Sequence, residues 1–427
     1  MAERSIGPDE TRRAITQRPQ GPTENAAAQG QDSGWQPPFF PASIAPAAAL
    51  VFNIILLGLT SLLTDIASEM VYPLIPFFLT VRLGASPAVL GVIEGLAESV
   101  ASILKAFSGY LSDRLQDRKR LTIVGYACSA CGKLLLVLAA GWGMVLGARI
   151  VDRIGKGIRT APRDALVADS APDGRHGRAF GLHRALDSCG AVIGVALAYW
   201  FFTRGSGDYS RVFLWSVLPA ALGVLLLFFV RQPRAGATPA TLPLLRWRAL
   251  PRRLRCFLAV SFLFTLGNSS NTFLLLRATN LGYTPATVIL LYLTFNAVYA
   301  AAAYPAGRLS DHVGRKVLLV SGYVFYAAVY AGFALVPASH ASLLWGMFAL
   351  YGLYIGITDG VEKALVADLA PPALRATGIG LHATIVGIGL FPASFIAGEL
   401  WEHIGPAAVF YFGGAMGLLA AGGLMLL

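Results

Sequence analysis

The chain carries its apolar residues in long blocks, and this feature limits its possible folds more than any other. Clear blocks cover residues 51–63, 121–142, 211–230, 257–276, 317–336 and 407–427. A helix needs roughly 20 consecutive apolar residues to cross a bilayer. Only 13% of the 427 residues are charged, whereas about 25% is usual in soluble domains. The sequence therefore predicts an all-α polytopic membrane protein and not a soluble enzyme.

Weaker apolar segments bring the expected count to about twelve membrane-spanning helices. Their approximate centres are residues 62, 97, 131, 155, 191, 220, 267, 295, 327, 351, 387 and 416. Basic residues gather in alternate connections, chiefly 112–120 and 231–255. Because such connections stay on the cytoplasmic side, we expect a multi-pass protein of the plasma membrane with both termini in the cytoplasm. The net charge of +11 then faces lipid head groups, and we expect no nucleic-acid partner.

The chain also repeats itself. Residues 157–172 read GIRTAPRDALVADSAP and residues 356–371 read GITDGVEKALVADLAP, at an offset of 199. An offset of 198 carries Gly84 and Pro87 onto an identical pair. Repeats of this length are typical of transporters whose substrate site lies between two similar halves. The expected organisation is a disordered cytoplasmic tail (1–46), an N-terminal six-helix bundle (47–230), a basic cytoplasmic linker (231–255) and a C-terminal six-helix bundle (256–427).

Two copies of a short motif lie one repeat apart. Residues 109–120 read GYLSDRLQDRKR, and residues 307–316 read GRLSDHVGRK. Both resemble the signature of the major facilitator superfamily, which follows the second and eighth helices, and the resemblance covers about 50–427. Residues 149–172 and 181–184 also resemble a poorly characterised bacterial branch of that superfamily. The resemblance implies alternating access of two six-helix halves, with a gate at the cytoplasmic face formed by Gly109, Asp113, Arg114, Arg118, Gly307, Asp311, Arg315 and Lys316.

The chain departs from the superfamily pattern at particular positions. Gln116 stands where the signature usually has glycine, and Asp117 lies inside the basic run. Antiporters of the superfamily tend to carry a Gly-Pro bend on the fifth helix. Here Gly190 and Gly194 are present, but Val195 stands where we expect the proline.

Acidic side chains in the expected first helix are candidates for proton coupling. An ionised side chain at bilayer depth costs roughly 3 kcal/mol, so its presence indicates a partner, a cavity or a function. Asp65 and Glu69 are four residues apart and share one face of the helix. Such a pair suits proton loading, and with Thr64 and Ser68 it also offers oxygen ligands to a metal ion.

The next three helices add charges of both signs. Glu94 and Glu98 repeat the four-residue spacing, and we expect Glu94 nearer the outer rim of the membrane. Lys133 is expected to form a buried ion pair with Glu98 or Asp65. Arg149 is the deepest cation of the fourth helix, and we expect it to bind substrate or a carboxylate.

Further polar residues complete the candidate set. Arg184 and Asp187 are three residues apart and can pair with each other or with the fourth helix. The polar run 268–271 interrupts the seventh helix and is expected to line a cavity opposite the first helix. The later charges of the fourth helix, Arg159, Arg163, Asp164 and Asp169, are expected at its cytoplasmic exit. The candidates for proton coupling or substrate binding are Asp65, Glu69, Glu94, Glu98, Lys133, Arg149, Asp152, Arg153, Arg184, Asp187, Asn268, Asn271, Asp359 and Glu362.

The sequence contains no HExxH, GxSxG or GxxxxGK[ST] motif, so we expect neither an enzyme nor a cofactor. The expected function is proton-coupled export of a small solute by a monomeric secondary transporter. One alternative is an exporter of divalent metals or metal chelates, with Asp65 and Glu69 as candidate ligands. An alternative of another class is a non-transporting membrane sensor or a lipid scramblase.

Overall fold

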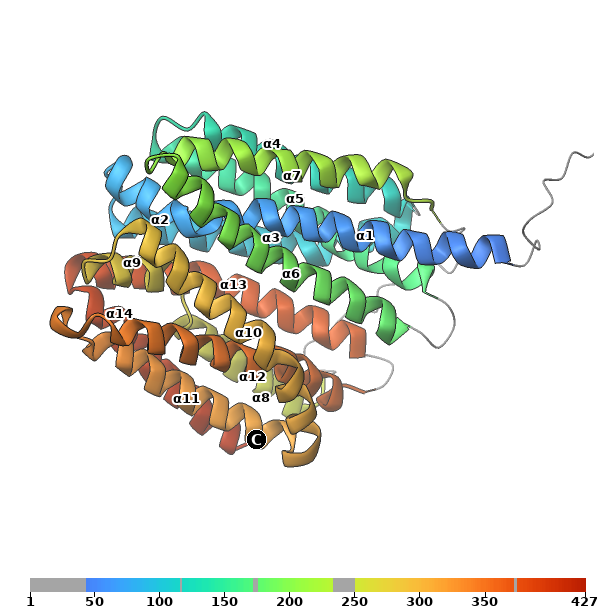
Figure 1. The fold of residues 1–427 in the computed structure, drawn as a ribbon. Helices are drawn as coiled ribbons and strands as arrows, with labels where there is room; N and C mark the ends of the chain where they lie inside the picture. The colour runs from blue at the N-terminus through green and yellow to red at the C-terminus, as the bar shows by residue number, and fades with distance from the viewer. Residues whose placement is uncertain (1–43, 116, 172–175, 233–249, 372–374) are drawn as a thin grey trace, which may run out of the picture.

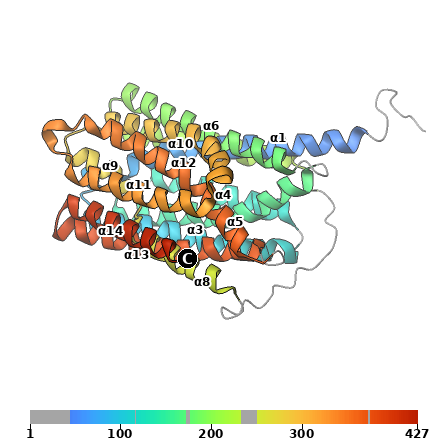
Figure 2. The ribbon, with the colours of Figure 1, turned by 90° about the horizontal axis from the view of Figure 1, so that it is seen from below.

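The computed structural model describes residues 44–115, 117–171, 176–232, 250–371 and 375–427. These residues form an elongated assembly of long helices that run in nearly the same direction (Figure 1; Figure 2). Most of the expected tail (1–46) and of the expected linker (231–255) lies outside the described residues, and residues 44–46 belong to the first helix.

The first group of helices extends from α1 to α7 and occupies the upper part of Figure 1. Its elements are α1 (Ile44–Val71), η1 (Tyr72–Leu74), α2 (Ile75–Phe77), η2 (Phe78–Arg82), α3 (Pro87–Leu115), α4 (Arg118–Val137), α5 (Trp142–Ser170), α6 (His176–Arg204) and α7 (Tyr209–Phe229).

The second group extends from α8 to α14 and occupies the lower part of the same view. Its elements are α8 (Arg252–Gly267), α9 (Thr272–Asn280), α10 (Pro285–Val313), α11 (Arg315–Leu335), η4 (Ala338–His340), α12 (Leu343–Leu369), α13 (Arg375–His403) and α14 (Pro406–Met425).

The helices confirm the fold class that the sequence predicts. Each of the twelve expected centres falls inside one of the long helices, counting the broken first and seventh spans once each. Over the described ranges, eleven spans are long and apolar enough to cross a membrane. The remaining long helix is α5, whose 29 residues include eight charged side chains. Its amphipathic character indicates that it lines a polar interior.

Local sequence signals explain where spans begin and break. Pro73 and Pro76 follow α1 and divide the end of that span into short turns, because proline removes an amide donor and disturbs the preceding turn. Gly84 and Gly282 adopt positive φ angles of 65° and 93°, which favour glycine, in the turns before α3 and α10.

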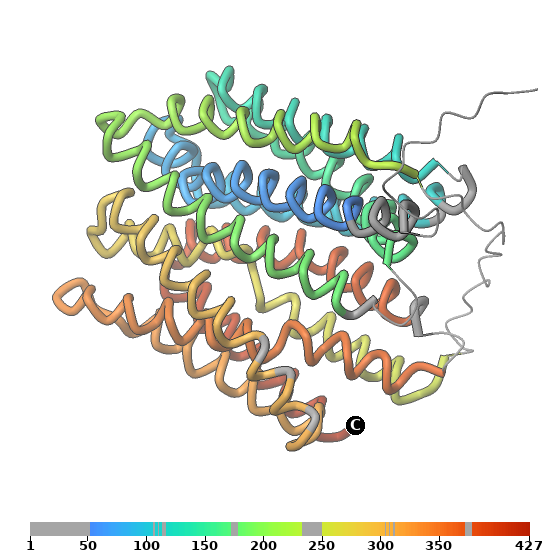
Figure 3. The backbone as a smooth tube through the Cα atoms, turned by 45° about the vertical axis from the view of Figure 1, so that its right-hand side comes forward, coloured from blue at the N-terminus to red at the C-terminus, as the bar shows by residue number. Residues whose placement is uncertain are grey.

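Each group packs mainly within itself. In the first group α1 contacts α6 and α7, while α5 contacts α3 and α4. In the second group α10 packs on α12, and α14 packs on α8 and α11. The two groups meet chiefly where α3 contacts α13 and where α6 contacts α10. Figure 3 shows α1 in blue beside α6 in green.

Candidate functional site

A cavity of about 370 Å³ lies between the two groups of helices. Its volume is within the usual range for small-molecule sites. One wall comes from α1, α3, α4 and α5, and it is dense in charged side chains. The opposite wall comes from the α8–α9 break, α10, α12 and α13, and it offers hydroxyl, amide and tyrosine side chains.

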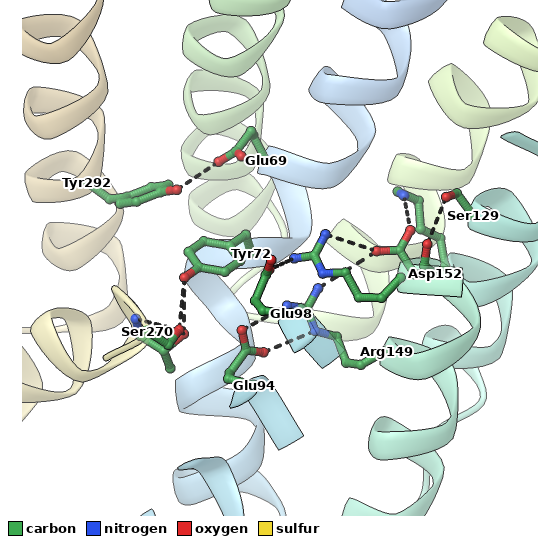
Figure 4. Close-up of polar contacts among 12 residues, drawn as sticks. Glu69, Tyr72, Glu94, Glu98, Ser129, Arg149, Asp152, Ser270 and Tyr292 are labelled. Carbon is green, nitrogen blue, oxygen red and sulfur yellow. Dashed lines mark hydrogen bonds and ion pairs between the residues drawn. The ribbon is translucent and has the colours of Figure 1, made fainter. Parts of the chain in front are cut away.

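The deepest ion pair of the charged wall joins α5 to α3. Arg149 donates from Nε and Nη2 to the two carboxylate oxygens of Glu94, at 3.0 and 2.8 Å (Figure 4). Glu94 has no exposed surface and Arg149 is 5% exposed, so this bidentate pair is sealed from solvent. The side chain of Glu94 therefore faces the interior of the first group and not the lipid boundary. Its position near the outer rim of the membrane stays a prediction.

Two further ion pairs extend this network. Lys133 donates from Nζ to Asp152 at 3.0 Å, and Arg153 contacts Glu98 at 2.7 Å. Arg153 also approaches Asp152 at 3.5 Å, which links the pairs to one another. The prediction that Lys133 pairs with Glu98 or Asp65 is wrong. The close packing of α4 on α5 brings Asp152 nearer than either of those carboxylates.

Asp65 and Glu69 also line the cavity, but their environment differs. Glu69 accepts a hydrogen bond from the Tyr292 hydroxyl at 3.0 Å, across the interface between the two groups (Figure 4). Asp65 makes no hydrogen bond or ion pair with any side chain that the structure describes. Neither carboxylate has a cation within ion-pair distance among the described residues.

Two glycines let α6 cover the helix that carries these carboxylates. A Cβ on Gly190 would lie 2.6 Å from the Leu62 carbonyl oxygen, and one on Gly194 would lie 2.6 Å from that of Ile66. Those distances are too short for any larger residue, so α6 approaches α1 beside the two acids. Val195 is buried in the core and does not interrupt α6.

The second wall contains the expected polar break. Asn268 and Asn271 line the cavity together with the two acids of α1, as the sequence predicted. The Tyr351 hydroxyl donates to the Asn271 side-chain oxygen at 2.8 Å. The backbone amide of Ser270 donates to the Ser394 hydroxyl at 3.2 Å, and this contact ties the break to α13.

Other predicted site residues lie away from the cavity lining. Arg184 forms an ion pair of 3.5 Å with Asp359, which connects α6 to α12, and it also contacts the Tyr299 hydroxyl. It does not pair with Asp187 or with α5, which were the expected partners. Asp187 instead accepts a hydrogen bond from Ser61 on α1.

Glu362 is held inside the second group. It accepts a hydrogen bond of 3.0 Å from the Tyr323 hydroxyl on α11. His382 lies 3.9 Å from its carboxylate and stacks on the Phe257 ring. Glu362 and Asp359 are therefore predicted site residues that the structure does not bring to the cavity wall.

The two motif copies hold matching contacts at one end of the bundle. Arg118 pairs with Asp169, and Arg315 pairs with Asp368. Lys119 and Lys316 each donate to a backbone carbonyl oxygen in the last span of their own group, at Phe228 and Met425.

The structure describes the remaining gate residues only in part. A Cβ on Gly109 would meet Ala161 at 3.5 Å, which is an ordinary contact, so this conformation does not require glycine there. The side chains of Asp113, Arg114 and Asp311, and the surroundings of Gly307, lie outside what the structure describes.

Sequence reasoning missed several lining residues. Lys156 and Arg159 of α5 line the cavity, although Arg159 was expected at the cytoplasmic exit. Tyr72, Tyr292 and Tyr351 also line it, and each bonds through its hydroxyl to another residue of the wall or its margin. The helical spacing of Lys156 and Arg159 from Asp152 and Arg153 was a usable signal. No comparable signal marked the tyrosines, since aromatic residues are common throughout membrane helices.

Two groups of membrane-spanning helices around a central polar cavity are the architecture typical of membrane transporters built from two similar halves. Residues 57–276 and 256–427 each match the family model of the Major Facilitator Superfamily, and the chain belongs to that superfamily. An uncharacterised MFS-type transporter of Methanocaldococcus jannaschii is 37% identical over 88% of this chain and 94% of its own length.

More distant similarities agree on the architecture. The multidrug resistance protein MdtH of Photorhabdus laumondii is 24% identical over 80% of this chain and 84% of its own. The crystal structure of the nucleoside transporter NupG superposes with a TM-score of 0.73 at 14% identity, covering 88% of this chain and 98% of that one. At that identity the superposition supports the fold alone.

Proposed function

We propose that the protein is a proton-coupled exporter of small organic solutes that works by alternating access. It acts as a monomer in the plasma membrane, with both termini in the cytoplasm. The organisation into two six-helix bundles, 47–230 and 256–427, supplies the two bodies that rock about the central cavity.

One observation carries this proposal: the carboxylates of the charged wall fall into two kinds. Glu94, Glu98 and Asp152 are each held in an ion pair with a cation. Protonating one of these would leave its cation uncompensated in a buried site, which is costly. Asp65 and Glu69 face the cavity without such a partner in the described structure, so they can take up and release protons without breaking a pair.

The cavity and the relatives favour an organic solute. Tyr292 and Tyr351 present aromatic rings on the second wall, and MdtH relatives are named as multidrug resistance proteins. The metal-exporter alternative has less support. In the part of the chain that the structure describes, no group of three or more His, Cys, Asp or Glu side chains is placed to hold a metal ion.

The first experiment measures proton movement in proteoliposomes with a trapped pH dye under an imposed pH gradient. The solute panel contains lipophilic cations, organic anions, amphoteric aromatic compounds and divalent metals. We expect a solute-dependent pH change for wild-type protein and its loss in the Asp65→Asn/Glu69→Gln double variant. Exchange of a labelled organic anion for the unlabelled anion, which needs no net proton transfer, should persist in that variant.

Glu399→Gln is the matched control, because Glu399 is a half-exposed carboxylate outside the cavity lining. It should couple as the wild type does. Coupling that survives in the folded double variant would disprove the assigned proton site. Solute flux without any pH change would indicate a uniporter, and folded protein without flux of any panel member would favour the sensor or scramblase alternative.

A further inference from the structure

Two cations of the cavity wall have no carboxylate partner. Lys156 and Arg159 lie three residues apart on α5 and both line the cavity. Neither forms an ion pair with any residue that the structure describes. Arg159 is only 6% exposed, and its Nε has no hydrogen-bond partner. Its guanidinium lies 4.2 Å from the centre of the Tyr126 ring, which holds the group in place.

The two unpaired acids of α1 line the same cavity as these cations. Helix α1 packs against α5, so the four side chains belong to one wall of the cavity. Among the described residues they do not close into ion pairs with one another.

The charges balance only when both α1 acids are ionised. The charged wall, counted together with Glu94 behind it, contains five acidic and five basic side chains. The acids are Asp65, Glu69, Glu94, Glu98 and Asp152, and the bases are Lys133, Arg149, Arg153, Lys156 and Arg159. A solute cation bound to the ionised α1 acids therefore leaves Lys156 and Arg159 without compensation. Arginine does not lose its proton in proteins, so Arg159 cannot relieve this imbalance by itself.

We propose that the solute is amphoteric, with its anionic group bound between Lys156 and Arg159 and its cationic group at Asp65 and Glu69. A solute of this kind satisfies both charged pairs at once, whereas a simple cation leaves Lys156 and the buried Arg159 guanidinium unmatched. Its organic body packs against Tyr292 and Tyr351 on the second wall. This substrate class rests on the proposed transport function. The residues that bind the anionic group of the solute lie on α5.

The test uses three forms of one aromatic probe with the purified full-length chain in detergent. They are para-(aminomethyl)benzoate, which is a zwitterion, its methyl ester, which is only a cation, and its N-acetyl derivative, which is only an anion. Binding is measured by calorimetry at fixed pH, so the result does not depend on proton flux. We expect the zwitterion to bind at least about tenfold more tightly than the ester, the effect of one charge-assisted hydrogen bond.

Variants then assign the two subsites. Lys156→Gln should weaken zwitterion binding about tenfold and leave ester binding unchanged. Arg159→Lys, which keeps the charge, should weaken the zwitterion less than Arg159→Gln does. Asp65→Asn/Glu69→Gln should abolish ester binding and retain the N-acetyl form. Lys363→Gln removes a cation outside the cavity lining and should change none of these values.

The outcomes separate this proposal from the proposed function. Equal binding of zwitterion and ester, with no effect of Lys156→Gln, overturns the anion subsite even if proton-coupled flux is observed. Failure of all three forms to bind folded protein overturns it as well. Subsite-specific binding without any solute-dependent proton movement would support the amphoteric site and reject the coupling mechanism.

Discussion

The two halves of the molecule place opposite chemistry at equivalent positions. The charged network of α3, α4 and α5 corresponds through the internal repeat to aromatic and small residues of α10, α11 and α12. With offsets of 197 to 199, Lys133 corresponds to Tyr330, Glu94 to Tyr292, Arg149 to Phe348, Asp152 to Tyr351 and Arg153 to Gly352.

The aromatic residues form a cluster as continuous as the ion network. Phe264 stacks on Tyr323 with ring centres 4.0 Å apart, and Tyr326 lies 4.1 Å from Tyr330. Their hydroxyls reach polar partners at the edge of the cluster, as when Tyr326 donates to the Gly267 carbonyl oxygen at 2.8 Å. The space between equivalent helices is thus filled by paired charges in the first half and by aromatic rings in the second.

This difference teaches how the two halves divide the work of the site. Buried ion pairs gain little net stability, because the cost of removing both charges from water offsets their attraction. The first half accepts that cost and provides groups that bind charges and exchange protons. Behind its polar cavity wall, the second half has an aromatic cluster whose stability comes from burial of ring surface.

The largest effect should come from breaking the Glu94–Arg149 pair. Arg149→Met leaves the Glu94 carboxylate, which has no exposed surface, without its bidentate partner. We expect the free energy of unfolding to fall by about 3–5 kcal/mol, because an uncompensated charge remains buried. Thermal denaturation in detergent, followed by size-exclusion chromatography, measures the loss.

The repeat provides the matched control for that variant. Phe348→Leu changes the equivalent position of the second half, where only packing is lost, and should cost about 1 kcal/mol. The double variant Glu94→Gln/Arg149→Met should recover part of the loss, since no charge is then stranded. An Arg149→Met effect no larger than that of Phe348→Leu would mean that the two halves do not differ as proposed.

A smaller effect is expected inside the aromatic cluster. Tyr326→Phe keeps the ring and removes only the hydrogen bond to Gly267, so the loss of stability should be about 1 kcal/mol. Solute-dependent proton movement in proteoliposomes should be unchanged, because Tyr326 does not line the cavity. A loss of coupling in folded Tyr326→Phe protein would mean that the second half takes part in proton transfer. It would contradict the proposal that only the first half exchanges protons.

The sequence predicted the fold well because bilayer thickness and backbone hydrogen bonding leave few arrangements for long apolar blocks. It also placed Asp65, Glu69, Asn268 and Asn271 around one cavity. Ion-pair partners were harder to predict. The distances of Lys133 to Asp152 and of Arg149 to Glu94 depend on helix rotation and packing, which spacing within one helix does not define.

Burial depth was the other source of error. Arg159 was placed at a cytoplasmic exit, yet it is buried and lines the cavity. Sequence position along a span gives the burial of a single side chain only approximately. Tyr292 and Tyr351 of the second wall were recognised as site residues only in the structure, where they line the cavity together with the charged network.

The smallest effect should come from Arg184 and Asp359, the ion pair that joins the two halves. Their side chains are 60% and 39% exposed, and exposed pairs contribute about 0–1 kcal/mol. Arg184→Gln should therefore change the free energy of unfolding by less than about 0.5 kcal/mol. Because the pair links α6 to α12, its loss should instead alter the rate of solute exchange across the membrane.

Salt dependence sharpens this last prediction. The difference in exchange rate between wild type and Arg184→Gln should shrink between low salt and about 1 M salt, where the Debye length is about 3 Å. Arg211→Gln is the control, because Arg211 pairs with Asp208 within the first half at a similarly exposed site. A stability loss well above 1 kcal/mol, or a rate difference that salt does not change, would show that the Arg184 pair acts as a buried contact and not as a screened link between the two halves.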